Sequence, residues 1–364
     1  MSRNTIISFP QMGSYAVVFK QLLRHLFPDA EIITPPPITQ KTVMLGSKYS
    51  PDFVCAPFKY NLGNYIEALG QGATILFQTG TGCRCGYYGE LQEQILKDLG
   101  YDFKFLCLSR DRLKPQTALK LLRDAGCQLP IRSVLQALAT AIRSIYILDR
   151  FEYWMRENIG FEADKGSCEY IHKNLLHNLS QSDSLFDTGK AASQCKASAR
   201  SVRIDRPESP LHIGVVGELY TLMEPFSNFN LERQLAKEGA VVSRNMSLWF
   251  LLFGRSDQRS LNNTGGYLKN IVGANGVDSI AQSLSYAKKQ YDGILHLKSF
   301  GCIPELNATP ALWKLCRKED IPVLQLSFDT HLSETGVNTR LEAFLDMLKM
   351  KKEAGNNAAG STWR

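Results

Sequence analysis

The sequence lacks a run of about 18 consecutive apolar residues, the length that a membrane-spanning helix needs. Met1 to Pro10 lacks the basic start, apolar stretch and small-residue cleavage site of an export signal. We therefore expect a cytoplasmic protein that makes no membrane contact. Long acidic or basic arms are also missing, and the charged residues, 21% of the chain, are spread along it. This distribution predicts a globular protein rather than a disordered one.

Length and composition favour two domains. A chain of 364 residues is long for a single core, and 44% hydrophobic residues are enough to fill two cores of about 150 residues each. The formal net charge of +7 is compatible with an anionic small ligand, an acidic protein partner or nucleic acid. Charge alone selects none of these three.

Short apolar runs alternate with helical patterns at both ends of the chain, which predicts βαβ units and parallel sheets. The expected fold class is therefore α/β, and the middle of the chain reads as helical because apolar residues recur there every three or four positions. "FVCAP" is among the segments expected to be strands. The expected organisation is an N-terminal α/β domain (1–110), a helical connector and polar linker (111–205), a C-terminal α/β domain (206–353) and a tail (354–364).

Nine cysteines are an odd number for a chain without an export signal, which argues against a disulfide framework. Most of them have an environment typical of a core or a helix face. We assign these four to that class: Cys107, Cys127, Cys168 and Cys316. Cys195 lies in the polar linker, and we expect an exposed thiol there.

Three other cysteines, Cys55, Cys83 and Cys302, each follow an expected strand and open a turn that contains Gly or Pro. Ligands bind at the carboxyl ends of the strands in an open parallel sheet, so thiols at these positions are placed to meet a ligand. Paired C-x2-C knuckles, the usual mark of a structural zinc site, are missing. Iron–sulfur clusters accept widely separated thiolates, and they suit this set better than any other metal.

The turn "GTGCRCG" has a competing interpretation, because exposed amides between a strand and a helix can also bind phosphate. Its glycines, Gly80, Gly82 and Gly86, are one residue off the dinucleotide-binding spacing. A nucleotide-binding α/β protein with incidental cysteines therefore remains an alternative. The same amides would otherwise donate to the sulfur atoms of a cluster.

Several longer motifs resemble the 2-hydroxyacyl-CoA dehydratase component family, and in particular its activator-related and double-cubane cluster branches. The resemblance covers Met1 to about Met350 and is weakest in the connector. It rests on "VCAPFKYNLGNYIEALGQGA", "GTGCRCGYYGELQEQILKDLGYDF", "IGVVGELYTLMEPFSNFNLERQLAKEG", "SFGCIPE" and "LSFDTHLSETGVNTRLEAFLDML".

The resemblance implies two Rossmann-like domains with an iron–sulfur cluster in the cleft between them, either a 4Fe-4S cluster or half of a bridged double cubane. The family's three cysteine ligands match Cys55, Cys83 and Cys302 of this chain. The resemblance also implies an ATP-hydrolysing iron–sulfur activator as partner, and a homodimer or a dimer with a related subunit. Cys85 departs from the family pattern, which usually has an apolar residue there, so it is either a bystander or an alternative ligand.

Other polar residues near the expected strand ends are weaker candidates. Arg84 could lend positive charge to a cluster, dock an acidic activator surface, or be an ordinary surface arginine. Glu218 in "VVGELYT" ranks above Glu90 as a polar residue at the site, because Glu90 suits the first turn of a helix without any catalytic role. His296 and His331 lie in or near strand ends without an identifiable partner.

Two functions follow from these expectations. The first is an iron–sulfur protein that takes ATP-driven, low-potential electrons from an activator and uses them to reduce or dehydrate a small-molecule substrate. The second is a non-catalytic electron-relay or assembly subunit that binds a cluster without turning over a substrate. Nucleic acid and membranes are not expected as partners in either case.

Overall fold

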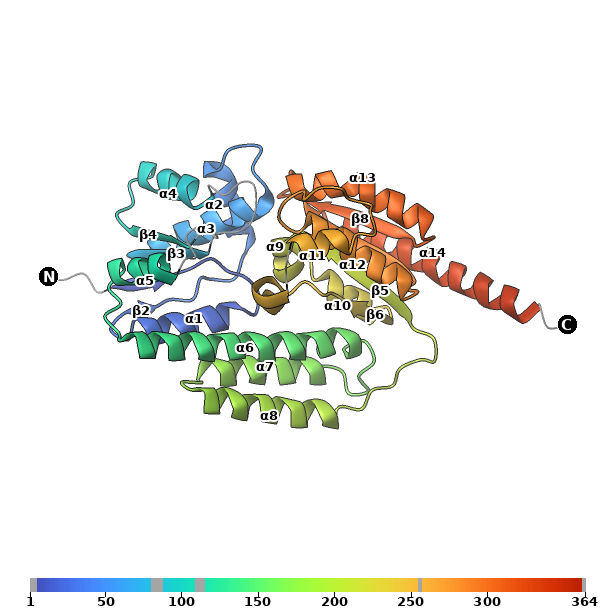
Figure 1. Cartoon of the computed structure of the whole chain (residues 1–364), viewed down its shortest axis with the longest axis horizontal. Coiled ribbons are helices and arrows are strands. Elements are labelled where there is room, and N and C mark those ends of the chain that lie inside the picture. Colours follow the sequence, from blue (N-terminus) through green and yellow to red (C-terminus); the bar gives the residue numbers. More distant parts are fainter. Residues whose placement is uncertain (1–4, 80–87, 109–114, 255–256, 362–364) are drawn as a thin grey trace. The chain divides into compact units, whose positions relative to one another are not determined.

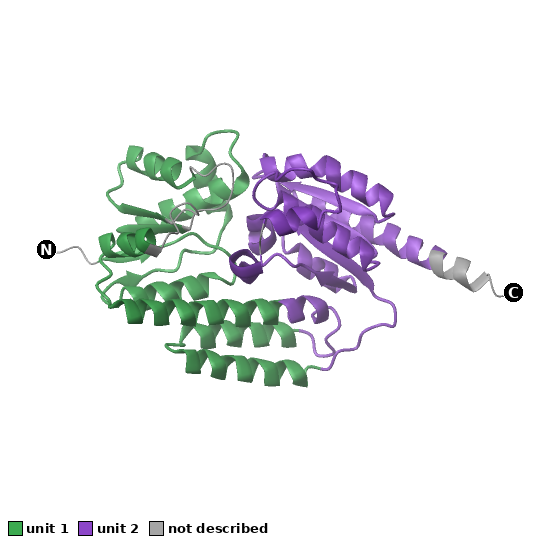
Figure 2. Cartoon of the chain, in the orientation of Figure 1, with its two compact units in different colours: residues 1–152, 166–202 green, residues 153–165, 203–364 purple. Residues whose placement is uncertain are grey.

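The computed structural model describes residues 5–79, 88–108, 115–254 and 257–361, and shows an α/β fold with two separate parallel sheets (Figure 1). The chain divides into two compact units, coloured separately in Figure 2. Unit 1 comprises Met1–Glu152 and Gly166–Val202, and unit 2 comprises Tyr153–Lys165 and Arg203–Arg364. The prediction of an α/β protein with two Rossmann-like sheets is confirmed.

The sheet of unit 1 has the strand order β2-β1-β3-β4, and all its pairings are parallel. Its strands are β1 (Ile6–Ser8), β2 (Glu31–Ile32), β3 (Ile75–Thr79) and β4 (Lys104–Leu108). Its helices are α1 (Ala16–Leu26), α2 (Gln40–Tyr49), α3 (Ala56–Gly70), α4 (Tyr88–Asp98), α5 (Pro115–Asp124), α7 (Ser167–Ser180) and α8 (Leu185–Ser201), together with α6 (Ile131–Asn158), whose residues from Tyr153 on belong to unit 2. Strand order reverses between β1 and β3, and ligands bind beside such a switch point in doubly wound sheets.

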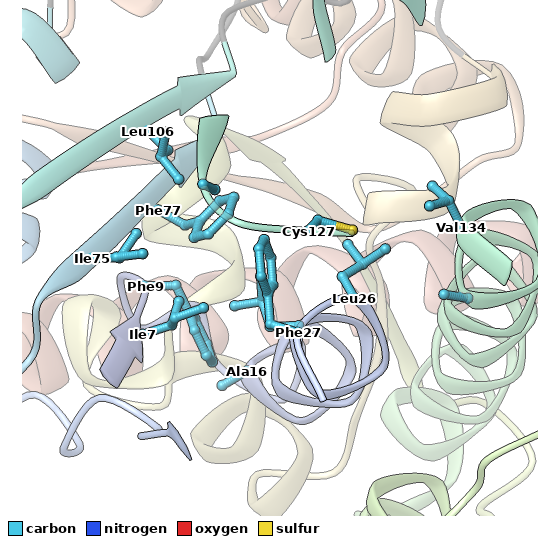
Figure 3. Packing of buried hydrophobic residues seen from close by; sticks show 13 residues of the cluster. Ile7, Phe9, Ala16, Leu26, Phe27, Ile75, Phe77, Leu106, Cys127 and Val134 are labelled. Atoms are coloured by element: carbon cyan, nitrogen blue, oxygen red, sulfur yellow. The ribbon is translucent and has the colours of Figure 1, made fainter. Parts of the chain in front are cut away.

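Both faces of this sheet are covered by helices. On one face, Phe77 of β3 packs against Phe27 beyond the end of α1, with ring centroids 5.7 Å apart. Figure 3 shows these rings in the same cluster as Ile7, Leu106 and Cys127. The opposite face is covered by α3 and α4. Burial on both sides explains why the strands are continuous apolar runs rather than alternating ones.

Helices α2 and α3 cross at very short range because each has a glycine at the contact. A Cβ at Gly46 would lie 1.8 Å from Lys59 O, and one at Gly63 would lie 2.1 Å from Thr42 O. The Thr42 hydroxyl also donates to Glu67 Oε2 at 2.7 Å. Buried side chains of α3, among them Phe58 and Leu62, pack with Leu76 of β3, and α3 is the helix that begins immediately after Cys55.

Helices α6, α7 and α8 run side by side in Figure 1. By length and composition α6 is apolar enough to cross a membrane, although 44% of its most apolar window is buried inside the protein. Core helices can be equally long and apolar, and Asp149 of α6 accepts a hydrogen bond from the hydroxyl of Tyr15.

The prediction of an exposed Cys195 is wrong. Its side chain is buried in α8, because the polar linker folds into a helix with an inward face, and burial raises its pKa to about 11.

Unit 2 repeats the topology of unit 1, with the strand order β6-β5-β7-β8. Its strands are β5 (Leu211–Gly217), β6 (Ala240–Ser243), β7 (Gly293–Ser299) and β8 (Val323–Phe328). Its helices include α9 (Leu219–Met223), α10 (Leu231–Lys237), α11 (Asp257–Asn262), α12 (Gly276–Lys288), α13 (Ile303–Lys318) and α14 (Glu334–Ser361). Helices α12 and α13 bury their apolar faces with Val216 and Ile294 of the sheet. Gly293 on β7 faces Phe344 and Leu348 of α14.

Two local expectations differ from the structure. Phe53 to Cys55 is a turn between α2 and α3 rather than a strand. The segment is bounded by Pro51 and Pro57, which disfavour strand pairing, and the Phe53 side chain is 93% exposed. Helix α14 also continues to Ser361, through most of the segment expected to be a tail.

Candidate metal centre

Cys55 is the N-cap residue of α3. Its backbone is extended (φ −68°, ψ 157°) and its side chain makes no capping hydrogen bond to the helix. Pro57 follows in the first turn, where its missing N–H costs nothing. Ser, Thr, Asp or Asn usually occupy an N-cap, because their side chains accept a hydrogen bond from the first turn. A thiol at this position leaves α3 without that side-chain cap.

Helix α4 places two side chains against the start of α3. The Tyr88 hydroxyl hydrogen-bonds with the Cys55 sulfur, and the Tyr88 ring meets Phe58 edge-on with centroids 5.1 Å apart. One turn later the buried Gln92 amide donates to Phe58 O at 3.2 Å. The segment that leads into α4 therefore ends beside Cys55.

That segment carries Cys83, Cys85, Arg84 and the three glycines Gly80, Gly82 and Gly86, all of which lie outside the described residues. Their expected roles stay predictions.

Cys302 is the N-cap residue of α13 in unit 2. It also has an extended backbone (φ −68°, ψ 98°), makes no side-chain capping bond, and is followed by Pro304 in the first turn. The chain reaches it from β7 through Gly301, whose φ of +78° is a conformation that glycine adopts without strain. Like Cys55, it is a half-buried thiol rather than half of a disulfide.

Cys55 and Cys302 thus share one local design, Cys-x-Pro at the start of a helix, in two units of equal strand order. Cys302 follows β7, and Cys83 follows β3, which occupies the same position in the other sheet. Both strands adjoin the switch point of their sheet, where ligands bind. A helix N-terminus favours the thiolate over the thiol, and the thiolate is the form that binds metals. The donor chemistry at these positions therefore fits a thiolate-ligated cluster.

A buried carboxylate lies in the first turn of α13, three residues after Cys302. Glu305 is fully buried and accepts hydrogen bonds from the Ser279 hydroxyl of α12 at 3.0 and 3.1 Å. Its Oε2 atom lies 2.8 Å from Nε2 of His296 on β7, which is also fully buried. Gln325 of β8 donates to the other ring nitrogen at 3.0 Å, so the Nε2 proton donates to Glu305. One carboxylate thereby ties α12, α13 and β7 together.

Replacing Glu305 with alanine should lower the free energy of unfolding by about 3 kcal/mol or more, because it leaves buried His296 and Ser279 groups without their acceptor. Urea unfolding followed by circular dichroism measures the effect. Glu342→Ala on the exposed face of α14 is the matched control and should stay within about 0.5 kcal/mol of the wild type. Equal losses in the two variants would contradict the role given to Glu305.

Glu218 and Glu90, the acidic candidates, both lie at helix starts. Glu218 is the N-cap of α9 and accepts from Tyr220 N at 2.8 Å, Thr221 N at 2.9 Å and the Thr221 hydroxyl at 2.7 Å. Burial raises the pKa of Glu218, the hydrogen bonds from Thr221 and Tyr220 lower it, and repulsion by Glu305 adds to the rise. Glu90 lies in the first turn of α4, half-buried. The geometry of Glu218 is that of a cap.

The cysteines expected in the core are there. Cys107, Cys127, Cys168 and Cys316 are all buried. Burial raises the pKa of Cys316 to about 12, which keeps it a thiol at neutral pH. Within the described ranges of each unit, His, Cys, Asp and Glu side chains form no group of three that could hold a metal ion.

Comparisons with known proteins leave the family open. No family model matches this chain, and no curated protein matches it. The resemblance to the dehydratase family therefore stays a prediction, and the residues themselves carry the functional argument.

Sequence reasoning found Cys302 and singled out His296, but it missed Glu305 and Ser279. Glu305 had one local signal, since it follows Cys302 within "CIPE" at the N3 position of a helix. A carboxylate at N3 usually faces solvent or the cap residue. Its burial and its pairing with His296 depend on α12 and β7, which come earlier in the chain.

Proposed function

We propose that this protein binds an iron–sulfur cluster through Cys55, Cys83 and Cys302 and handles low-potential electrons delivered by an ATP-hydrolysing activator. The substrate would be a small molecule that is reduced or dehydrated. The cluster would be a 4Fe-4S cluster or half of a bridged double cubane, and the protein would work as a homodimer or with a related subunit.

The observation that carries this proposal is the pair of thiols at helix N-caps, Cys55 and Cys302. A thiol is a poor cap, yet both helices begin with one, and both have proline two residues later. Such positions give up capping energy of about 1 kcal/mol each. A metal–thiolate bond, strengthened by the positive helix end, offsets that loss.

When bound, the cluster would supply one-electron chemistry at low potential. The residues of this chain would hold and orient it. Cys55 is steadied by the Tyr88 hydroxyl, and Cys302 by the anchored first turn of α13. A reducing compartment such as the cytoplasm suits these thiols, because all seven cysteines within the described ranges are unbridged.

Anaerobic purification followed by iron and sulfide analysis tests the proposal. We expect iron and sulfide in near-equal amounts, with a brown chromophore that air bleaches. A colourless protein that takes up no iron on anaerobic reconstitution, but binds ATP, would overturn the proposal in favour of the nucleotide-binding alternative. ATP-dependent turnover with an activator would then distinguish an enzyme from an electron relay.

A further inference from the structure

β8 is an edge strand of the unit 2 sheet that lacks the usual protection of an edge. Among the described residues it is the longest of the four edge strands, with six residues against two in β2, five in β4 and four in β6. Its sequence, "VLQLSF", contains no charge, proline or glycine. Such residues, or a covering element, keep natural edge strands from pairing with other chains. β6 is fully buried, whereas four of the six residues of β8 are only half-buried.

The outer side of β8 carries the backbone groups of every second residue. Phe300 N donates to Phe328 O at 2.7 Å, so the carbonyl of Phe328 points toward β7. Because these groups alternate in direction along a strand, those of Val323, Gln325 and Ser327 point away from β7. Within the described ranges these three residues make no backbone hydrogen bond to another element on that side. Three N–H and three C=O groups are therefore available to a further strand.

Helix α13 presents exposed apolar side chains beside this edge. Gln325 Nε2 donates to Thr309 Oγ1 at 3.0 Å, which places Thr309 over β8. Leu306 and Trp313 lie three residues before and four residues after Thr309, on the same side of the helix. Both are exposed, Trp313 by 50%. An open hollow beside Trp313 is also lined by Val323, so this stripe reaches the start of β8.

Helix α14 repeats the arrangement on the opposite face of the sheet. Gly293 faces α14 while the next residue, Ile294, packs with α13, so the two helices cover opposite faces. Lys351 Nζ of α14 lies 2.9 Å from Oδ2 of Asp320, in the turn that leads into β8. Met347, one turn earlier on the same side of α14, is 44% exposed. β8 thus lies between two helices that both expose apolar side chains toward its edge (Figure 1).

The partner that fits all three layers is a second copy of this chain. An extended peptide would satisfy the backbone groups of β8 but would leave the apolar side chains of both helices uncovered. A second unit 2 brings the same strand with the same helix on each face. The charges agree, since Arg317 lies at the start of β8 and Asp329 directly follows its end. Neither forms an ion pair within the described ranges, and antiparallel pairing brings each beside its opposite on the partner.

We propose that β8 pairs antiparallel with β8 of a second copy, about a twofold axis beside Gln325, so that two four-stranded sheets become one continuous sheet. In this register Val323 lies opposite the partner's Ser327, and the two residues exchange backbone hydrogen bonds. On one face α13 packs against the partner's α13 through Leu306 and Trp313, and on the other face the two α14 helices meet. This interface rests on unit 2 alone and needs no cluster, so its test is separate from that of the proposed function.

Sedimentation equilibrium of the full chain at micromolar concentrations tests the interface, and we expect a dimer. Trp313→Glu should weaken dimerisation about 30-fold or more, because it replaces a central aromatic contact with a charge at two places of a twofold interface. Tyr170→Glu is the matched control, at a 68% exposed aromatic residue of α7 in unit 1, and should stay a dimer. A monomeric wild type would overturn the proposal and leave β8 to an extended segment of another protein. Equal dimerisation of the wild type and Trp313→Glu would also overturn it.

Hydrogen exchange distinguishes strand pairing from a contact made by the helices alone. The outward amides of β8 should exchange quickly in a monomer, where they face water, and slowly in the dimer. Mass spectrometry of a peptide that spans 323–328 should show protection that rises with protein concentration and is lost in Trp313→Glu. Circular dichroism should show that variant folded, since half of the Trp313 surface is already exposed. A dimer whose β8 amides exchange as quickly as those of the monomer would overturn the pairing.

Charge reversal tests the direction of the pairing. Arg317→Asp and Asp329→Arg should each weaken dimerisation on the order of 5-fold, because each places like charges together at the rim of the interface. The double variant should recover most of the loss, since it exchanges the two charges and keeps each pair opposite. A double variant weaker than both single variants would contradict the antiparallel register.

Discussion

Replacing Cys302 with serine should remove most of the iron from the anaerobically reconstituted protein. Under the proposed function the change removes a ligand, so the loss should exceed the roughly 10- to 100-fold fall in affinity that replacing an outer-shell partner causes. A serine hydroxyl does not ionise at neutral pH, and as a good N-cap it should keep α13 folded. Iron per protein, with the visible spectrum, measures the effect.

Cys316→Ser is the control for this experiment because Cys316 lies in the same helix and is buried in the core. That variant should lose some stability, since a hydroxyl replaces a packed thiol, but it should keep its iron. Cys55→Ser should behave as Cys302→Ser does. If Cys316→Ser lost iron while Cys55→Ser and Cys302→Ser kept it, the ligand assignment would be wrong.

Replacing Gly63 with alanine should destabilise unit 1 strongly. The new Cβ would lie 2.1 Å from Thr42 O and 2.9 Å from Thr42 C, both backbone atoms that cannot rotate away. Overpacking of this kind costs about 1–3 kcal/mol and sometimes more, while the gain in helix propensity from glycine to alanine is only about 1 kcal/mol. The steric cost should prevail. Urea unfolding measures the loss.

Gly70→Ala provides the matched control in the same helix. A Cβ at Gly70 would meet nothing within 4 Å, and the residue does not have a positive φ. That variant should be neutral or slightly more stable than the wild type. Because α3 begins after Cys55, Gly63→Ala should also weaken iron retention, whereas Gly70→Ala should not. Equal stability of the two variants would contradict the close α2–α3 crossing.

Short apolar runs in the sequence predicted most of the strands named below. The apolar runs at "TIISFP", "ATILFQTG" and "DGILHL" became β1, β3 and β7, because a strand buried on both faces is recognisable from a short apolar run. The run at "FVCAP" has the composition of a strand, but among the residues that the structure describes it pairs with no strand. Pairing is a long-range property that a five-residue window does not contain.

Burial was predicted well inside regular elements and badly in the linker. Cys168 and Cys316 fall on apolar helix faces, and the sequence shows this directly. Cys195 lies among Ser, Lys and Ala residues, which gave no sign of a buried face. The packing of α8 against α7 decides its burial, and that packing depends on residues elsewhere in the chain.

The sequence by itself determined the fold class and the placing of Cys302 at a turn after a strand, because strand period, glycine and proline are local signals. Only the tertiary structure decided that Cys55 and Cys302 occupy equivalent helix caps. It also decided that Glu305 is held by Ser279 and His296. Charge pairing in a core depends on which distant elements pack together, and here β7, α12 and α13 meet only in the folded chain.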